Sequence, residues 1–335
     1  MEKQGPPHVL SYRDVENPRI GDDDVLVRIM AAGVNRLDIW VRSGVYTTEL
    51  PRILGSEGAG VVEAVGSRVS NISPGDMVLI NPALTDGVCS FCLQGYDSLC
   101  ENLRLMGAGS DGCYAELVRV PARNVHQIPK GLGFEEAASV IVNYMTVWHG
   151  LVTRAGLEYG STVLVVAAGS GVGVAAIQLS KLYGCTVITT VGEEWKREKA
   201  QQLGADYVVN RRVEDPVEAV KGFTGGKGVD MVFEHAGGAM WEAGVKCLKP
   251  GGAMVFCGAT SGETVGLNIR YAYRRQLRLI GSYSWNRGEI EKVLRLVEMG
   301  RLRPIVDRVF KLEDAAKAHI RMERDEHFGK ILLKP

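Results

Sequence analysis

Four residues with metal-binding side chains lie within the stretch DGVCSFCLQGYDSLC, residues 86 to 100. Asp86, Cys89 and Cys92 are each three apart, and Cys100 follows eight residues later. Zinc accepts thiolates at about 2.3 Å and a carboxylate oxygen at about 2.0–2.2 Å in one tetrahedral shell. Four protein ligands leave no position for substrate. The spacing therefore predicts one structural zinc, outside the catalytic chemistry, bound by Asp86, Cys89, Cys92 and Cys100.

Two other interpretations of this stretch stay open. The cysteines are reduced thiols without metal, or Cys89 and Cys92 form a disulfide, which a reducing cytoplasm disfavours. The remaining cysteines stand singly among apolar residues and are expected to be buried, inert thiols; they are Cys113, Cys185, Cys247 and Cys257.

A glycine-rich turn follows the apolar run STVLVVAA and precedes a helical pattern. Its residues are Gly169, Ser170, Gly171, Val172 and Gly173. Small residues at such a place let backbone N–H groups approach a pyrophosphate at the positive end of a helix. Because the turn lies between a strand and a helix, it predicts dinucleotide binding, and a merely structural tight turn is the alternative.

The end of the next strand bears on the choice between NAD and NADP. An acidic residue there would accept the ribose hydroxyls and repel a 2′-phosphate. Val191 and Gly192 stand at that place, and Lys196 follows one helical turn later, while Glu193 argues the other way. We therefore expect NADPH to be preferred, with Gly192 and Lys196 at its site. A solvated helix face is the alternative for Lys196.

The order of predicted elements indicates two kinds of domain. Short apolar runs with turn signals from residue 25 to about 120 are typical of an irregular β domain. Residues 134–154 have apolar positions at helical spacing behind an acidic first turn, which predicts a helix. From residue 161 onward strands and helices alternate, which predicts βαβ units and a doubly wound parallel sheet. The tail EHFGKILLKP predicts a last strand.

The length and the charge of the chain favour a two-domain protein and argue against nucleic-acid binding. A chain of 335 residues is long enough for two domains. Lys plus Arg and Asp plus Glu both number 39, so no net positive field favours nucleic acid. No signal peptide and no membrane-spanning apolar run is recognisable. We expect a cytoplasmic protein that binds neither nucleic acid nor membrane.

Several stretches, in this order along the whole chain, closely resemble the medium-chain dehydrogenase/reductase superfamily, in particular its zinc-type alcohol dehydrogenases and quinone oxidoreductases. They are AAGVNRLDIWVRSGVY, LGSEGAGVVEAVG, GDMVLI, the cysteine stretch, EEAASVIVNYMTVWHGL, AAGSGVGVAAIQLSK, LGADYVVN and HFGKILL. The resemblance implies a GroES-like catalytic domain over residues 1–125 and 271–335 around a Rossmann NAD(P)-binding domain over residues 126–270.

The resemblance also implies roles for single residues. Thr146 matches a neighbour of the nicotinamide, and Lys330 matches a basic residue that contacts the cofactor phosphates. Asp86 stands where the four-cysteine zinc lobe of the family begins with cysteine. A homodimer or homotetramer, paired through the edge of the Rossmann sheet, is implied as well.

The resemblance fails at the catalytic zinc. The family's ligands are a cysteine, a histidine and commonly a second cysteine, and this chain has Asn35, Ser56 and Val142 at those positions. These groups do not hold tetrahedral zinc as cysteine and histidine do. Leu37 replaces the hydroxyl of the family's proton relay, and the stretch AGVN is similar to the quinone oxidoreductases, which need no metal.

Hydride transfer from NADPH remains possible without zinc, and the loss of carbonyl polarisation favours easier acceptors. We therefore expect an NADP(H)-dependent reductase of a ketone, quinone or enone. Candidate catalytic residues, each with a structural alternative, are Asn35, Asp38, Tyr46, Ser56 and Glu57. The alternative function is a catalytically retired, NADPH-binding protein of the lens-crystallin kind.

Overall fold

The computed structural model describes residues 1–335, and their contacts divide the chain into two compact units. The first unit is Met1–Val142 with Trp285–Pro335, and the second is Asn143–Ser284. The divisions thus lie after residues 142 and 284, later than the boundaries after 125 and 270 that the resemblance implied.

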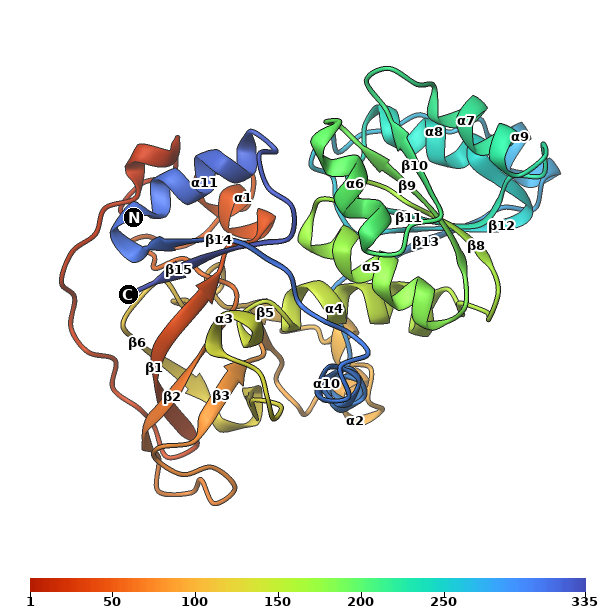
Figure 1. The fold of residues 1–335 in the computed structure, drawn as a ribbon. Helices are drawn as coiled ribbons and strands as arrows, with labels where there is room; N and C mark the ends of the chain where they lie inside the picture. Colours follow the sequence, from red (N-terminus) through yellow and green to blue (C-terminus); the bar gives the residue numbers. More distant parts are fainter. The chain divides into compact units, whose positions relative to one another are not determined.

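The first unit is built on a seven-stranded sheet with the order β14-β15-β1-β2-β3-β7, in which β6 also pairs with β1 (Figure 1). This sheet is the irregular β domain that the sequence predicts. Its strands are β1 (Asp24–Gly33), β2 (Gly58–Val65), β3 (Met77–Ile80), β6 (Leu117–Pro121), β7 (Val125–Gln127), β14 (Val306–Lys311) and β15 (Lys330–Lys334). Two short strands, β4 (Ala83–Leu84) and β5 (Arg104–Leu105), pair separately.

Strand β1 lies at the centre of this sheet and pairs antiparallel with β2, β6 and β15. Its inward residues Val25, Val27 and Ile29 are almost fully buried, as the period of two in a half-buried strand requires. Gly33 of β1 lies opposite Leu332 of β15. The last strand of the chain is therefore fixed beside the first, which confirms the prediction of a C-terminal strand.

Helices of the first unit are mostly short. They are α1 (Arg36–Ser43), α2 (Ser90–Leu93), α3 (Phe134–Ala137), α10 (Ile290–Glu298) and α11 (Ala315–Glu323). Helix α1 ends at Gly44, whose φ of 94° is left-handed and whose N–H donates to the Trp40 carbonyl, a C-terminal arrangement that favours glycine.

The prediction of one continuous helix over residues 134–154 is wrong, because the helical stretch is interrupted. Helix α3 ends at Ala137, α4 (Ile141–Val147) begins after a turn, and a π-helical stretch, Trp148–Arg154, follows directly. At the start of α4 the N–H groups have no acceptor within the helix. The N–H of Val142 instead donates to Glu57 Oε1 at 2.8 Å. This acceptor comes from a distant part of the chain, so the local pattern does not reveal the break.

The second unit contains a six-stranded, fully parallel sheet of order β10-β9-β8-β11-β12-β13. The order reverses at β8, the first strand of the unit, as in doubly wound nucleotide-binding sheets. The predicted α/β class is confirmed. The strands are β8 (Thr162–Val165), β9 (Thr186–Val191), β10 (Tyr207–Asn210), β11 (Val229–Glu234), β12 (Leu248–Phe256) and β13 (Arg278–Gly281).

Helices connect these strands, and Figure 1 shows them on both faces of the sheet. They are α5 (Gly171–Leu182), α6 (Trp195–Gln202), α7 (Pro216–Phe223), α8 (Ala239–Cys247) and α9 (Ile269–Arg274). Three of them begin with side-chain caps: Ser170 Oγ accepts from Gly173 N at 2.9 Å, Asp215 accepts from Val217 N at 2.8 Å, and Asn268 accepts from Tyr271 N at 3.0 Å. None of the helices is long and apolar enough to cross a bilayer.

Candidate functional site

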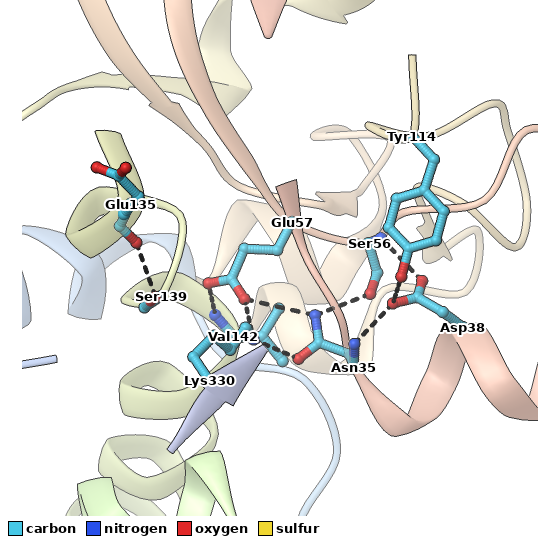
Figure 2. A network of polar contacts seen from close by, with 9 residues as sticks. All are labelled: Asn35, Asp38, Ser56, Glu57, Tyr114, Glu135, Ser139, Val142 and Lys330. Carbon is cyan, nitrogen blue, oxygen red and sulfur yellow. Dashed lines mark hydrogen bonds and ion pairs between the residues drawn. The ribbon is translucent and has the colours of Figure 1, made fainter. Parts of the chain in front are cut away.

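Asn35, Ser56, Glu57 and Lys330 form a buried polar cluster in the first unit, and Figure 2 shows their side chains pointing toward one another. Asn35 precedes α1, Ser56 and Glu57 precede β2, and Lys330 opens β15. Each is at most 7 % exposed. The sequence analysis named all four residues, but assigned Lys330 to a different task. The structure brings it to Asn35 across 295 positions of sequence.

The ammonium of Lys330 is bonded to two members of this cluster. Its Nζ donates to Asn35 Oδ1 at 2.6 Å and forms an ion pair with Glu57 Oε2. The other carboxylate oxygen of Glu57 accepts the N–H of Val142. The contact of Lys330 with cofactor phosphates, which the resemblance implies, stays a prediction.

Asn35 connects the two halves of the cluster. Its Nδ2 donates to Ser56 Oγ at 3.1 Å and lies 3.4 Å from Glu57 Oε2. Both polar ends of the Asn35 amide are therefore bonded inside the protein, as buried polar groups require. The arrangement presents amide, hydroxyl and ammonium donors within one hydrogen-bonded group, a set that can bind a carbonyl oxygen.

Asp38 holds the backbone around this cluster. Its Oδ2 accepts from Asn35 N at 2.8 Å, and its Oδ1 accepts from Gly55 N at 3.3 Å and Ser56 N at 3.0 Å. Burial raises the pKa of Asp38 to about 6, although the Asn35 N–H and the charge of Lys330 act in the opposite direction. One carboxylate thus joins the start of α1 to the segment that carries Ser56.

Tyr46 lies apart from these hydrogen bonds. Its ring stacks on Trp40 with centroids 5.8 Å apart and an interplanar angle of 15°, and the residue is 39 % exposed. This stacking is what we expect if Tyr46 is a packed aromatic residue. Its catalytic role stays a prediction.

The donor set does not fit a catalytic zinc. Of the three family positions, Asn35 and Ser56 offer neutral oxygen or nitrogen atoms, and Val142 offers only an apolar side chain. The Asn35 oxygen is already bonded to the Lys330 ammonium. Soft thiolate and imidazole ligands, on which tetrahedral zinc sites depend, are missing from all three positions.

The cysteine stretch does fit a metal. The ligand atoms of Asp86, Cys89, Cys92 and Cys100 all lie within 4.8 Å of one another, which brings together the four residues that the sequence analysis named. Three sulfur atoms and one carboxylate form a donor set that zinc accepts. Zinc at this site remains a prediction.

Hydrogen bonds from the surrounding loop orient the carboxylate of Asp86. Its Oδ1 accepts from Val88 N at 2.8 Å and Cys89 N at 2.9 Å, and its Oδ2 accepts from Asn102 Nδ2 at 2.9 Å. The guanidinium of Arg123 donates to the Asp86 carbonyl at 3.2 Å. Such outer bonds fix the direction of a metal ligand, so residues beyond the four candidate ligands also organise the loop.

In the second unit, the glycine turn between β8 and α5 leaves no room for side chains. A Cβ at Gly173 would lie 2.2 Å from the Ala167 carbonyl oxygen, and one at Gly171 would lie 2.6 Å from the Asn143 amide. Ala167 itself has a φ of 57°, an uncommon value for alanine. The close turn places the N-terminus of a twelve-residue helix at the end of β8, so these residues fit a dinucleotide phosphate.

The end of β9 is flanked by basic residues. The N–H of Arg211 donates to the Val191 carbonyl at 3.0 Å, and Arg212 forms an ion pair of 2.5 Å with Glu193. Lys196 is only 2 % exposed, so the alternative of a solvated helix face is wrong. Arg211 and Arg212 were not among the predicted site residues, although two consecutive arginines directly after β10 were a usable signal.

The remaining cofactor candidates also lie in the second unit. Gly192 follows β9 directly, and Thr146 lies half-buried in α4. Their contacts with a cofactor stay predictions.

Comparisons with known proteins match two long segments of the chain. Residues 21–130 match the alcohol dehydrogenase GroES-like domain, and residues 171–299 match the zinc-binding dehydrogenase family. An NAD-dependent alcohol dehydrogenase of Saccharolobus solfataricus is 32 % identical over 97 % of this chain and 96 % of its own. A quinone oxidoreductase of Pseudomonas aeruginosa is 31 % identical over 99 % and 97 %.

A solved structure is also very similar. The crystal structure of an NAD-dependent alcohol dehydrogenase superposes with a TM-score of 0.97 at 43 % identity, covering 100 % of this chain and 98 % of the other. The similarity is full-length in both sequence and structure.

The cysteine stretch yields the first prediction. Elemental analysis should give about one zinc per chain, and a chelator should lower thermal stability, because metal binding contributes directly to folding of such a loop. Asp86→Ala should weaken zinc retention, whereas Asp14→Ala, at an exposed position, should not. Two zincs per chain, or abrupt loss of turnover on chelation with the fold unchanged, would contradict a purely structural site.

The buried ion pair yields the second prediction. Lys330→Met leaves the Glu57 carboxylate buried without its partner and should cost about 3–5 kcal/mol in urea unfolding. Adding Glu57→Gln should recover part of this loss. The control is Lys334→Met, four residues along β15, which breaks the exposed pair with Glu135 and should cost less than about 1 kcal/mol. An equal loss of unfolding free energy in the two lysine variants would show that the buried pair contributes no more to stability than the exposed pair.

Proposed function

Because the chain belongs to the medium-chain dehydrogenase/reductase superfamily and is an oxidoreductase, we propose that it transfers hydride from NADPH to a ketone, quinone or enone without a catalytic zinc. The cluster of Asn35, Ser56, Glu57 and Lys330 carries this proposal. It has hydrogen-bond donors and one buried cation where zinc-type relatives need soft ligands.

The residues of the cluster support a reaction that depends on hydrogen bonding. When bound, reduced nicotinamide supplies the hydride. The Asn35 amide and the Lys330 ammonium stabilise negative charge that develops on the acceptor oxygen, as preorganised donors do. The hydroxyl of Ser56, which lies beside the Asp38 carboxylate, passes its proton to that oxygen and takes a replacement proton from solvent water. A metal would add several kcal/mol of polarisation, so conjugated acceptors suit this site better than simple ketones.

The experiment for this proposal is a substrate panel. Purified protein is mixed with NADPH and with quinones, conjugated enones, aryl ketones and simple aliphatic ketones in turn, and NADPH absorbance is followed. We expect the fastest oxidation with the conjugated acceptors, and unchanged rates when the metal is removed from protein that stays folded. Tight NADPH binding with no turnover on any acceptor would support the catalytically retired alternative instead.

We also propose that NADPH binds more tightly than NADH. The two similar alcohol dehydrogenases described above are named as NAD-dependent, so the proposed cofactor of this chain differs from theirs. Here the strand end carries Val191 and Gly192 and no acid, and the nearby Glu193 is neutralised by its ion pair with Arg212. The backbone N–H of Arg211 donates to the carbonyl of Val191 at the same strand end. A 2′-phosphate therefore meets no acid at the strand tip, and the charge of Glu193 is offset by Arg212.

Calorimetric titration tests this choice of cofactor. The parent protein should bind NADPH at least about tenfold more tightly than NADH, a difference of about 1.4 kcal/mol. Lys196→Ala and Arg211→Ala should each reduce the difference, while Lys311→Ala, on β14 of the first unit, should leave it unchanged. Equal or reversed affinities in the parent protein would refute the preference for NADPH.

The substrate is proposed to be a small molecule, and the protein is proposed to form a homodimer or homotetramer. Strand β13 is an edge of the parallel sheet, and an open edge has unpaired backbone groups that a second copy can satisfy.

The cytoplasm is the proposed location of the protein. All seven cysteines are free thiols, which suits a reducing compartment.

A further inference from the structure

A row of polar side chains leads from the carboxylate of Glu323 to Asp38. Arg42 Nη2 forms an ion pair of 2.5 Å with Glu323, and Arg42 Nη1 lies 3.5 Å from His319 Nδ1. His319 Nε2 lies 3.2 Å from the Tyr114 hydroxyl, which in turn lies 3.3 Å from Asp38 Oδ2. Figure 2 shows the inner end of this row, with the Tyr114 hydroxyl directed at Asp38. All five residues belong to the first unit.

His319 is neutral in this environment. Its side chain is fully buried in α11, and burial together with the charges of Arg42 and Arg36 lowers the pKa of His319 to about 3. A neutral imidazole carries one proton, so one ring nitrogen donates and the other accepts.

Arg42 decides which nitrogen of His319 carries the proton. A guanidinium has only donors, so the nitrogen that faces it, Nδ1, must be the acceptor. The proton is therefore on Nε2, which donates to the Tyr114 oxygen. With Nδ1 protonated instead, two donors would face each other at Arg42, which is unfavourable in a buried site.

The same reasoning sets the direction of the Tyr114 hydroxyl. Burial and the neighbouring Asp38 carboxylate raise the pKa of Tyr114 well above its ordinary value, so the hydroxyl keeps its proton. Because its oxygen accepts from His319, the hydroxyl hydrogen is available to donate to Asp38 Oδ2. Every bond from Arg42 inward thus points toward Asp38.

The row is not a path for protons. A proton passed inward from His319 would have to be replaced at Nδ1 by Arg42, and a guanidinium does not deprotonate in proteins. Arg42 is also held at its outer side, where its Nε donates to the Gly5 carbonyl at 3.1 Å. The row therefore orients groups and leaves their protons in place.

We propose that His319 and Tyr114 are positioning residues that hold the carboxylate of Asp38 in one orientation, and through Asp38 set the contact between Asn35 and Ser56. The Tyr114 bond adds to the bonds that Asp38 accepts from the backbone N–H groups of Asn35, Gly55 and Ser56. Those bonds join the two segments whose side chains meet in the candidate site. This role rests on the proposed function.

Other charged and titratable groups also face Asp38 and are part of its environment. Lys330, on β15, is the nearby positive charge, and the buried thiol of Cys113 lies beside Asp38 and Glu57. Substitutions at Tyr114 and His319 leave these groups in place, so they change the hydrogen bonds on Asp38 without changing the formal charges around it.

Histidine tautomers supply the first test, which needs no activity. The chain has six histidines, so protein labelled with ¹⁵N-histidine gives a small set of ring signals. The signal that disappears in the His319→Gln variant belongs to the His319 ring. We expect His319 to carry its proton on Nε2 between about pH 5 and 8, without titrating in that range. A proton on Nδ1, or titration of His319 near its ordinary pKa, would overturn the proposal even if no substrate is ever found.

Kinetics on the best acceptor from the panel supply the second test. Tyr114→Phe and His319→Leu should each lower kcat about tenfold with little change in KM, because ground-state binding does not depend on the row. His319→Gln, which keeps one donor and one acceptor, should restore most of kcat. Tyr12→Phe and His8→Gln, at exposed positions, are the matched controls. Unchanged kcat in folded Tyr114→Phe protein, or no rescue by glutamine, would overturn the proposal, whereas an inactive parent protein would count only against the proposed function.

Discussion

The buried ion pair between Lys330 and Glu57 is the interaction on which the rest of the first unit depends. Two opposite charges that are each at most 2 % exposed stay inside a protein only when each has its partner and further hydrogen bonds. Asn35 and the Val142 N–H provide those bonds. The pair therefore holds the last strand of the chain, the segment before β2, the start of α1 and the start of α4 in one arrangement.

This constraint explains why the candidate site differs in kind from the cysteine loop. The loop takes its four candidate metal ligands from 15 consecutive positions, so short-range turns already bring them close. The polar cluster takes its members from three separate segments of the chain, and its geometry exists only when β1, β2 and β15 are paired. Asp38 reinforces it by bonding the backbone on both sides. A shift of any of these elements would leave buried polar groups without partners, which is costly.

Much of the architecture was readable from sequence because it depends on local patterns. The alternating strands and helices from residue 161, the glycine turn before α5 and the terminal strand all follow from periodicity and turn chemistry. Helix 134–154 was predicted without its break because the acceptor for the Val142 N–H is Glu57, 85 positions away. Lys330 was predicted to contact cofactor phosphates, and its bonds to Asn35 and Glu57 were not foreseen for the same reason.

What the sequence determined by itself was the set of chemical groups: three thiols and an acid at metal-binding spacing, a glycine-rich turn between a strand and a helix, and no soft ligands at the positions of a catalytic zinc. Tertiary structure alone decided how the other groups are combined. It placed a lysine ammonium between Asn35 and Glu57, paired Glu193 with Arg212, and aligned Arg42, His319 and Tyr114 toward Asp38. The physical reason is that hydrogen bonds and ion pairs act over a few ångströms, while their partners here are separated by tens to hundreds of residues.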